Sequence, residues 1–314
     1  MSAEGEHSVD DLPAPGRLVA ATYRLRRMLG VGAMGAVFEA RHELLGLDVA
    51  LKVLLPKHAR DGRLVARFLK EARTAALVTS PHVVRVFDVG VLESGAPYLV
   101  MEYLRGVDLS AVLSARGPLR PEAAAALLLQ AIEGVAAVHE AGIVHRDLKP
   151  SNLFLESVAG RAPLVKVVDF GISKALGGAG EITSTDSLLG SPAYMAPEQI
   201  AEPGRVDTRA DLWSLGVIAF QLVTGVLPFD APSIGGLLLA ILEGVPRPAR
   251  EFAPDLPPAF DEILRRCLRR DPAARFADTL ALREALLPFD GGPAALAELG
   301  PSPAPLAAKL GARL

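Results

Sequence analysis

VHRDLKPSN, residues 144–152, is the most specific segment of this 314-residue sequence. It places a carboxylate, Asp147, shortly before an amine, Lys149, and an amide, Asn152. We interpret Asp147 as the group that orients a substrate hydroxyl, Lys149 as a cation that steadies a transferring phosphoryl group, and Asn152 as a metal ligand. A polar turn without chemistry is the alternative. The fixed spacing of the specified positions favours a phosphoryl-transfer loop.

Downstream of this loop, the segment VKVVDFGIS, residues 165–173, carries Asp169 after an apolar, strand-like run. A carboxylate is a hard oxygen ligand and suits Mg²⁺, an ion that bridges nucleotide phosphates instead of occupying an all-protein cage. We therefore expect Asp169 to be the principal metal ligand, with Asn152 as the second. An Asp-x-Gly turn of purely structural value is the alternative.

Upstream, the segment LGVGAMGAV, residues 29–37, spaces Gly30, Gly32 and Gly35 as G-x-G-x-x-G. Such a triplet also occurs in dinucleotide-binding folds, where it follows a strand and opens a helix. Here the residues AVFEARHE that follow have the pattern of a returning strand. The pattern therefore predicts a hairpin that covers phosphates, and an ordinary flexible turn is the alternative.

Lys52 and Glu71 form a second expected pair. Lys52 ends the strand-like VALK, and Glu71 lies in FLKEA on the helix predicted to follow. A carboxylate at Glu71 can hold the Lys52 ammonium toward the α- and β-phosphates of a nucleotide. Taken alone, a strand lysine and a helical glutamate are more often solvated surface residues.

Hydrophobic periodicity predicts a small β-rich lobe at the start of the chain. Residues 23–55 alternate short β-like segments with glycine-containing turns, and residues 82–90 and 96–104 supply two further strands. Residues 64–77 have helical spacing. We expect a five-stranded antiparallel sheet with one main helix, ending near Leu104.

Helical segments dominate the remainder, so the predicted fold is α+β and bilobal. The small lobe would occupy residues 23–104 and a larger helical lobe residues 105–288, with a ligand-binding crevice between them. Segments rich in Ala, Gly and Pro at 1–22 and 289–314 are expected to be flexible tails.

Composition excludes several other classes of protein. The formal net charge of −3 provides no basic field for nucleic acid, and the single cysteine, Cys267, excludes an internal disulfide framework. Residues 1–16 are polar and acidic, unlike a signal peptide. The uncharged stretch Leu212–Phe229 has almost the length of a membrane span, but its Ser, Gln, Thr, Gly and Pro residues favour a buried core helix. We expect a cytoplasmic chain without a membrane segment.

With these motifs in hand, the chain resembles the protein kinase superfamily, and specifically the eukaryotic-type serine/threonine kinases of bacteria. The resemblance runs from Tyr23 to Leu287 and includes further motifs beyond those above. These are Ala196, Pro197 and Glu198 in YMAPE; Asp211, Trp213 and Gly216 at the start of a central helix; and Arg275, which pairs with Glu198 in the family. The resemblance implies ATP and Mg²⁺ as cofactors, with Mn²⁺ as a substitute ion, and serine or threonine hydroxyls of proteins as acceptors.

The resemblance also implies which residues bind the nucleotide. Met101 takes the gatekeeper position, and Asp108 the position of a ribose contact, although an exposed turn aspartate explains Asp108 equally well. The residues expected to contact the adenine are Leu29, Val37, Ala50 and Phe154 through their side chains, and Glu102 and Leu104 through their backbones.

Charge and hydroxyl content indicate regulation by phosphorylation. Arg146 and Lys174 could bind a phosphate and order the segment KALGGAGEITSTDSLLGSPAY, residues 174–194. We expect the chain to phosphorylate itself there, and a loop of merely solvated hydroxyls is the alternative. The candidate acceptors are Thr183 and Thr185, with Ser187 third. Ser191 stands where the family usually has threonine. Serine also carries a hydroxyl, so the functional group at this position is retained.

Two other functions remain open at this point. A pseudokinase would signal by shape alone, and its mark would be a lost phosphate or metal residue. A small-molecule phosphotransferase of related fold would lack the APE segment and the Trp213 region.

Overall fold

The computed structural model describes residues 12–32, 35–157, 160–169 and 192–299. These residues form two compact units. Residues 12–78 and 84–104 belong to the first, and residues 79–83 and 105–299 to the second. Among the described residues, the first unit ends at Leu104.

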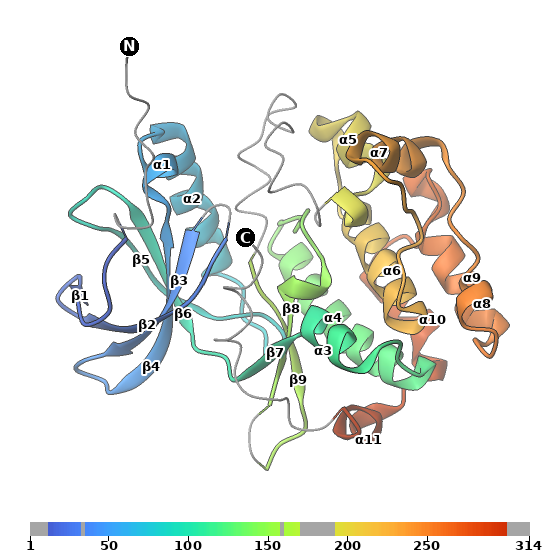
Figure 1. Ribbon diagram of the computed structural model, residues 1–314, viewed down its shortest axis with the longest axis horizontal. Coiled ribbons are helices and arrows are strands. Elements are labelled where there is room, and N and C mark those ends of the chain that lie inside the picture. The colour runs from blue at the N-terminus through green and yellow to red at the C-terminus, as the bar shows by residue number, and fades with distance from the viewer. Residues whose placement is uncertain (1–11, 33–34, 158–159, 170–191, 300–314) are drawn as a thin grey trace. The chain divides into compact units, whose positions relative to one another are not determined.

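The first unit is built on a six-stranded sheet whose adjacent strands are all antiparallel (Figure 1). The strand order is β1-β2-β3-β4-β6-β5. The strands are β1 (Leu18–Val19), β2 (Tyr23–Val31), β3 (Gly35–His42), β4 (Leu47–Leu54), β5 (Val86–Val91) and β6 (Pro97–Glu102). Two helices accompany the sheet, α1 (Pro56–Ala59) and α2 (Gly62–Ala75), and α2 packs against β5 and β6.

The alternation of side chains along the strands separates an apolar face from the face on which nucleotide-binding residues are predicted. Phe38 in β3, Leu51 in β4 and Val100 in β6 lie opposite one another in register, and all three are fully buried in one hydrophobic cluster. Because successive side chains of a strand point to opposite faces, the neighbouring residues Val37 and Lys52 belong to the other face.

The second unit combines a three-stranded antiparallel sheet with nine helices among its described residues. Its strands are β7 (Gly106–Asp108), β8 (Leu153–Glu156) and β9 (Leu164–Val167). Its helices are α3 (Leu109–Arg116), α4 (Pro121–Glu140), α5 (Pro197–Ala201), α6 (Arg209–Thr224), α7 (Ile234–Glu243), α8 (Ala249–Phe252), α9 (Pro258–Cys267), α10 (Thr279–Leu286) and α11 (Gly292–Ala297).

Two apolar helices, α4 and α6, pack against each other in the core of this unit (Figure 1). Nearly every residue of α6 is buried, including Trp213 and Phe220, as expected for a helix that is apolar on all sides. The prediction that this stretch is a core helix is confirmed. Among the described residues, α4 alone is long and apolar enough to cross a membrane. Of the 18-residue apolar stretch in this helix, 67% is buried within the fold.

The structure corrects the predicted strand count, and it places a strand and a helix in the segments that were expected to be flexible tails. The sheet has six strands where five were expected, because Leu18 and Val19 pair with Arg24 and Tyr23 as β1. That strand lies within the expected N-terminal tail, and α11 lies within the expected C-terminal tail. Both segments are short, and their order depends on tertiary packing: Val19 and Leu296 are each about 2% exposed or less.

Candidate active site

The loop that follows α4 brings together three of the predicted catalytic residues, Asp147, Lys149 and Asn152. Lys149 Nζ donates to Asp147 Oδ2 at 2.9 Å, and Asn152 Nδ2 donates to the same oxygen at 3.3 Å. Asn152 Nδ2 also donates to the Asp147 carbonyl at 2.8 Å. Asp147 and Asn152 are buried and Lys149 is half-buried. These contacts hold the Asp147 carboxylate in one orientation beside a cation, which is the arrangement that hydroxyl orientation requires.

A buried carboxylate on α6 supports the backbone of this loop. Asp211 Oδ2 accepts the His145 N–H at 2.8 Å, and Oδ1 accepts the Arg146 N–H at 2.8 Å. His139 at the end of α4 approaches Asp211 Oδ2 through Nε2 at 2.8 Å. Arg146 has a positive φ of 63°, a conformation that non-glycine residues keep only when their surroundings impose it. Asp211 supplies that constraint.

His145 links the loop to the strand that leads into Asp169. Its Nδ1 accepts the Asp147 N–H at 3.3 Å, so Nε2 carries the proton and donates to the Val168 carbonyl at 3.2 Å. The Val168 N–H in turn donates to the Asn152 carbonyl at 3.0 Å. Asp169 follows directly, also with a positive φ, of 57°. The hydrogen-bonded network therefore joins Asn152 to Val168, the residue directly before Asp169.

The donor atoms in this network fit a magnesium ion that is shared with a nucleotide. Asn152 uses its amide nitrogen inside the loop, which leaves the amide oxygen as its metal-binding atom. Among the described residues no group of three or more His, Cys, Asp or Glu side chains forms a metal site. Mg²⁺ characteristically binds through one or two carboxylates, waters and substrate phosphates, so the residues present fit this ion.

The face of the first unit's sheet opposite the apolar cluster carries predicted nucleotide-binding residues in register. Lys52 lies opposite Val37 on β3, and Ala50 lies opposite Met101 on β6. Lys52 and Ala50 are two residues apart on β4, so all four belong to one face. Gly35 is required here by close packing, because a Cβ at this position would lie 2.6 Å from the Val53 carbonyl oxygen.

The other predicted nucleotide residues are distributed over both units. Leu29 and Gly30 lie in β2 at a register irregularity, Gly32 follows that strand, and Glu102 ends β6. Leu104 is the last residue of the first unit. In the second unit, Asp108 and Phe154 lie opposite each other in the β7–β8 pair. Asp108 caps α3 by accepting the Ala111 N–H at 2.9 Å, so it has a structural role besides any ribose contact.

Several predicted residues fall outside the described side chains. Glu71 lies in α2 by its backbone. Lys174, Thr183, Thr185, Ser187 and Ser191 lie outside the described residues. The Lys52–Glu71 pair and the regulatory sites therefore stay predictions.

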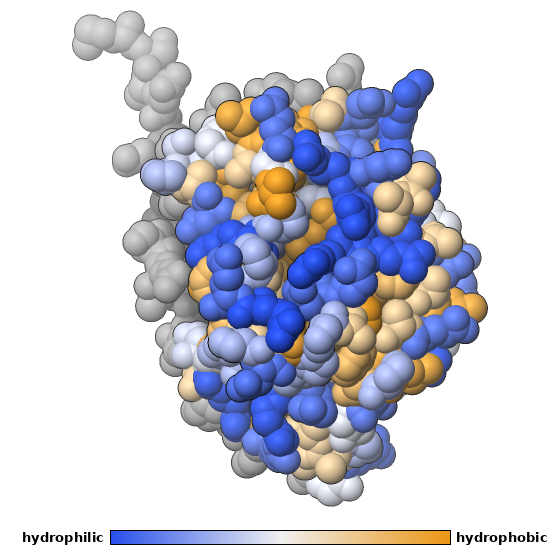
Figure 2. All heavy atoms as spheres, turned by 90° about the vertical axis from the view of Figure 1, so that its right-hand side faces the viewer, coloured by the Kyte–Doolittle hydropathy of each residue, from blue (hydrophilic) through white to orange (hydrophobic). Residues whose placement is uncertain are grey.

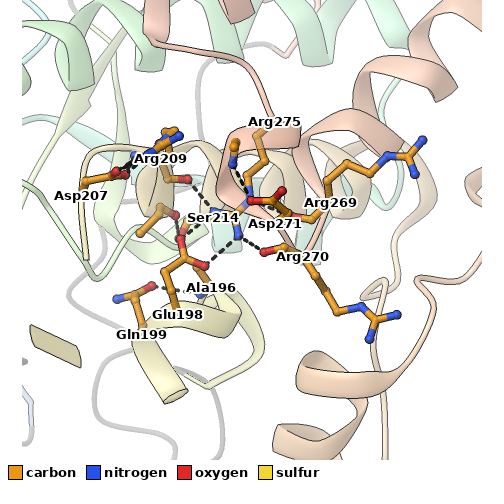
Figure 3. Close-up of polar contacts among 12 residues, drawn as sticks. Ala196, Glu198, Gln199, Asp207, Arg209, Ser214, Arg269, Arg270, Asp271 and Arg275 are labelled. Carbon is orange, nitrogen blue, oxygen red and sulfur yellow. Dashed lines mark hydrogen bonds and ion pairs between the residues drawn. The ribbon is translucent and has the colours of Figure 1, made fainter. Parts of the chain in front are cut away.

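The expected pair between Glu198 and Arg275 is present and bidentate (Figure 3). Both Arg275 terminal nitrogens donate to the Glu198 carboxylate at 2.7 Å. The guanidinium is fully buried, and its other N–H groups donate to three main-chain carbonyls, those of Arg209, Arg269 and Arg270. A buried cation needs such complete pairing. The cluster therefore joins α5, which carries Glu198, to the start of α6 and to residues 269–275.

Two ionisable groups next to this cluster have shifted pKa values. Hydrogen bonds from Arg209 lower the pKa of Asp207, against the opposing effect of partial burial. Burial raises the pKa of Tyr194 to about 12, although its hydroxyl donates to Gln221 Oε1 at 2.7 Å. Tyr194 therefore remains a neutral hydrogen-bond donor over the physiological range of pH.

Sequence reasoning missed two residues that position the loop, His139 and Gln199. Gln199 Nε2 donates to the Arg146 carbonyl at 2.8 Å, while its Oε1 accepts the Ala196 N–H at 3.0 Å. The one signal available for Gln199 was its position three residues after Ala196, where a side chain can reach back to the helix start. His139 has no local signal, because its partner Asp211 is distant in the sequence.

Comparison with known proteins assigns the family. The protein kinase domain family matches residues 23–287, so the chain belongs to the protein kinase family. The crystal structure of the PknI kinase domain from Mycobacterium tuberculosis superposes with a TM-score of 0.69 at 29% identity, covering 88% of this chain and 99% of that one.

The curated relatives place the chain among bacterial eukaryotic-type serine/threonine kinases. It is 38% identical over 280 residues to serine/threonine-protein kinase pkn3 of Myxococcus xanthus, covering 88% of this chain and 51% of the relative. It is 34% identical over 261 residues to PrkC of Bacillus subtilis, covering 83% of this chain and 39% of the relative. The chain thus spans about half or less of the length of these relatives.

Proposed function

We propose that this chain transfers the γ-phosphoryl group of ATP to serine or threonine hydroxyls of proteins. The observation that carries the proposal is the Asp147 carboxylate, held by Lys149 at 2.9 Å and by Asn152 at 3.3 Å on a loop that Asp211 supports. Serine and threonine as acceptors are supported by the names of the relatives and by Lys149, Pro150 and Ser151 in the loop.

In the proposed mechanism the chain orients the reactants and neutralises charge. Asp147 accepts a hydrogen bond from the acceptor hydroxyl and aligns its oxygen with the phosphorus atom. Lys149 stays near the same carboxylate and stabilises the negative charge of the phosphoryl group during its transfer. Lys52 orients the α- and β-phosphates, and Asn152 and Asp169 would hold the metal.

Bound Mg²⁺ would supply charge neutralisation on the nucleotide phosphates, and ATP the phosphoryl group itself. The oxygen donors of Asn152 and Asp169 support Mg²⁺ as the natural ion, and Mn²⁺, which accepts the same ligand types, as a substitute. Adenine would contact the face of the sheet that carries Val37, Ala50 and Met101.

The test is the change Asp147→Asn. Loss of the carboxylate should lower phosphoryl transfer by about 10²–10⁴-fold, measured with radiolabelled ATP and a generic protein acceptor. Nucleotide binding and the unfolding midpoint should change little. The matched control is Asp255→Asn, the same change at an exposed position, which should retain activity. Undiminished transfer by the Asp147 variant would reject the assigned role.

The two alternative functions predict different outcomes in the same assay. A pseudokinase would bind nucleotide without transferring phosphate to any acceptor. A small-molecule phosphotransferase would label aminoglycosides or sugars but not protein. The presence of Lys52, Asp147, Asn152 and Asp169 argues against the first, and the APE segment with its Arg275 anchor argues against the second.

Activation by self-phosphorylation belongs to the same proposal. The Arg146 backbone is held on both sides, by Asp211 and Gln199. Within the described residues no carboxylate pairs with its guanidinium, which supports a role in binding a phosphate. Peptide mass mapping after incubation with MgATP should find phosphate on Thr183 or Thr185, or next on Ser187. Absence of phosphate throughout residues 174–191 would reject this part.

Proteins, including other copies of this chain, are the proposed partners, and nucleic acid is not one of them. The net charge of −3 supports this, because nucleic-acid binding depends on a basic surface. We propose a cytoplasmic location for the kinase domain, because ATP is its phosphoryl donor. Fractionation of cells that express the chain would test the location.

A further inference from the structure

The helical unit contains a pocket of about 590 Å³ between the end of α6, the loop 244–249 and α9. Its floor is apolar and consists of side chains that are 4% exposed or less, Phe220, Phe229, Leu264 and Leu268. Its volume lies within the range of pockets that bind drug-sized ligands. No predicted catalytic or nucleotide-binding residue lines it.

Arginine side chains surround this apolar floor. Four arginines line the pocket, Arg247, Arg265, Arg269 and Arg270, against a single acidic residue, Asp261. Asp261 is buried and already neutralised, because Arg265 Nη2 lies 2.5 Å from its Oδ2. Within the described part of the chain, no carboxylate pairs with the other three arginines. The pocket therefore has a clear excess of positive charge.

Overall composition does not account for this excess. The whole chain is slightly acidic, with a formal net charge of −3, so the pocket is opposite in sign to the molecule. Figure 2 views the side of the molecule on which α8 and α9 lie, and it shows strongly hydrophilic residues close around hydrophobic ones. An apolar floor with a basic rim is complementary to a ligand that is both apolar and acidic.

The wall formed by the loop 244–249 is held in place before any ligand binds. Pro246 and Pro248 restrict the backbone, and the Arg247 N–H donates to the Pro228 carbonyl at 2.9 Å. The Arg247 guanidinium lies 4.4 Å from the centre of the Phe252 ring. A preorganised wall lowers the entropy lost on binding.

We propose that this pocket docks an acidic segment of a partner protein. One or two large apolar side chains of the segment, such as Leu or Phe, contact the floor, and neighbouring carboxylates pair with Arg247, Arg269 and Arg270. Arginine favours this partner because its planar fork binds carboxylates with two parallel hydrogen bonds. The proposal concerns binding alone, so it stands or falls independently of catalysis by Asp147.

The test begins with a phage-displayed library of random peptides of about twelve residues, selected on the full chain. The peptides recovered should carry Asp or Glu beside Leu or Phe. By titration calorimetry, the double variant Arg247→Glu/Arg269→Glu should bind them at least about tenfold more weakly. The matched control, Arg205→Glu/Arg250→Glu, makes the same change of charge at two exposed arginines outside the pocket and should bind as the unaltered chain does.

A second variant tests the pocket at an exposed residue, where a substitution should not disturb folding. Val245 lies at the pocket but is 82% exposed, so Val245→Asp leaves the core intact while adding a repelling charge, and it should also weaken binding. Selected peptides without acidic and apolar residues would overturn the proposal, as would equal binding to the pocket and control variants. Failure to select peptides, with binding of phosphatidylglycerol vesicles that the pocket variants abolish, would overturn it in favour of a lipid.

Discussion

At the residue scale, a single buried carboxylate determines the geometry of the catalytic loop. Asp211 accepts two main-chain N–H groups, from His145 and Arg146, and interacts with His139. Its side chain is 0% exposed, so water cannot replace it as an acceptor. An unsatisfied buried donor costs about 1–3 kcal/mol. The chain therefore maintains the strained backbone of Arg146 through a residue that need not touch the substrate.

The pair between Glu198 and Arg275 leads to a prediction about stability. Glu198→Ala would leave a fully buried guanidinium without its carboxylate, and breaking a buried pair this way costs about 3–5 kcal/mol. Urea unfolding should show a loss of that size. The control Glu133→Ala removes an exposed ion pair with Arg283 and should cost at most about 1 kcal/mol. Equal losses in the two variants would contradict this account.

Tyr23 leads to a prediction about alkaline pH. Its hydroxyl donates to Asp88 Oδ2 at 3.1 Å, and burial, followed by the charge of Asp88, raises its pKa from 10.0 to about 12. The fold thus favours the neutral phenol, whose contribution to stability is complete below pH 10 and is lost as the pH rises to about 12. Tyr23→Phe removes this contribution at every pH.

The unaltered chain should therefore exceed the Tyr23→Phe variant in stability at pH 8, by about 0.5–1.5 kcal/mol for the hydrogen bond. The difference should shrink between pH 10 and pH 12. Urea unfolding at several pH values measures it, and other titrating groups, such as Tyr194 and Cys267, cancel because both proteins contain them. A difference that stays constant across this range would refute the assignment.

At the element scale, α6, which carries Asp211 in its first turn, is in close contact with α9. Gly216 in α6 faces Cys267 at the end of α9, and a Cβ added to Gly216 would lie 2.3 Å from the Cys267 Cβ. Atoms cannot approach that closely, so the helices would have to separate. Burial also raises the Cys267 pKa to about 12, which agrees with a core role for this thiol.

We expect Gly216→Ala to lower the free energy of unfolding by about 1–3 kcal/mol, despite the better helix propensity of alanine. The control is Gly235→Ala in α7, where nothing lies within 4 Å of an added Cβ. At that position alanine causes no clash, so its higher helix propensity should stabilise the chain by up to about 1 kcal/mol. Thermal and urea unfolding measure both variants. Equal effects in the two helices would show that packing at Gly216 is not limiting.

At the scale of the whole molecule, predicted nucleotide-binding residues occur in each of the two compact units. Lys52 belongs to the first unit, and Asp169 to the second. If both contact MgATP, nucleotide at about 100 times its Kd should raise the free energy of unfolding by about 2.7 kcal/mol. Lys52→Met and Asp169→Ala should each reduce this gain at the same nucleotide concentration.

The control for this measurement is Lys70→Met, the same change at an exposed position on α2. It should keep the full gain. The effect of Asp169→Ala should depend on Mg²⁺, since the proposed role of Asp169 is to bind the metal. A gain that survives in both the Lys52 and the Asp169 variants would mean that the nucleotide is bound elsewhere.

The sequence by itself determined the family and the identities of the candidate catalytic residues. Motifs such as VHRDLKPSN are short, so their chemistry and spacing are complete within a few residues. The strands of the sheet and the buried character of α6 were also predictable, because hydrophobic periodicity is local. The short elements β1 and α11 were not, since too few residues carry a pattern and packing alone orders them.

Only the tertiary structure decided how these residues are held and what else surrounds them. The contacts of Asp211 with His139 and of Gln199 with the Arg146 carbonyl join residues 53 or more positions apart. The basic pocket likewise combines arginines from the loop 244–249 and from α9 and the residues after it. Such groups meet only when the chain folds. A buried polar group must form hydrogen bonds, and it forms them with whichever group the fold brings close in space. No fixed spacing in the sequence specifies that partner.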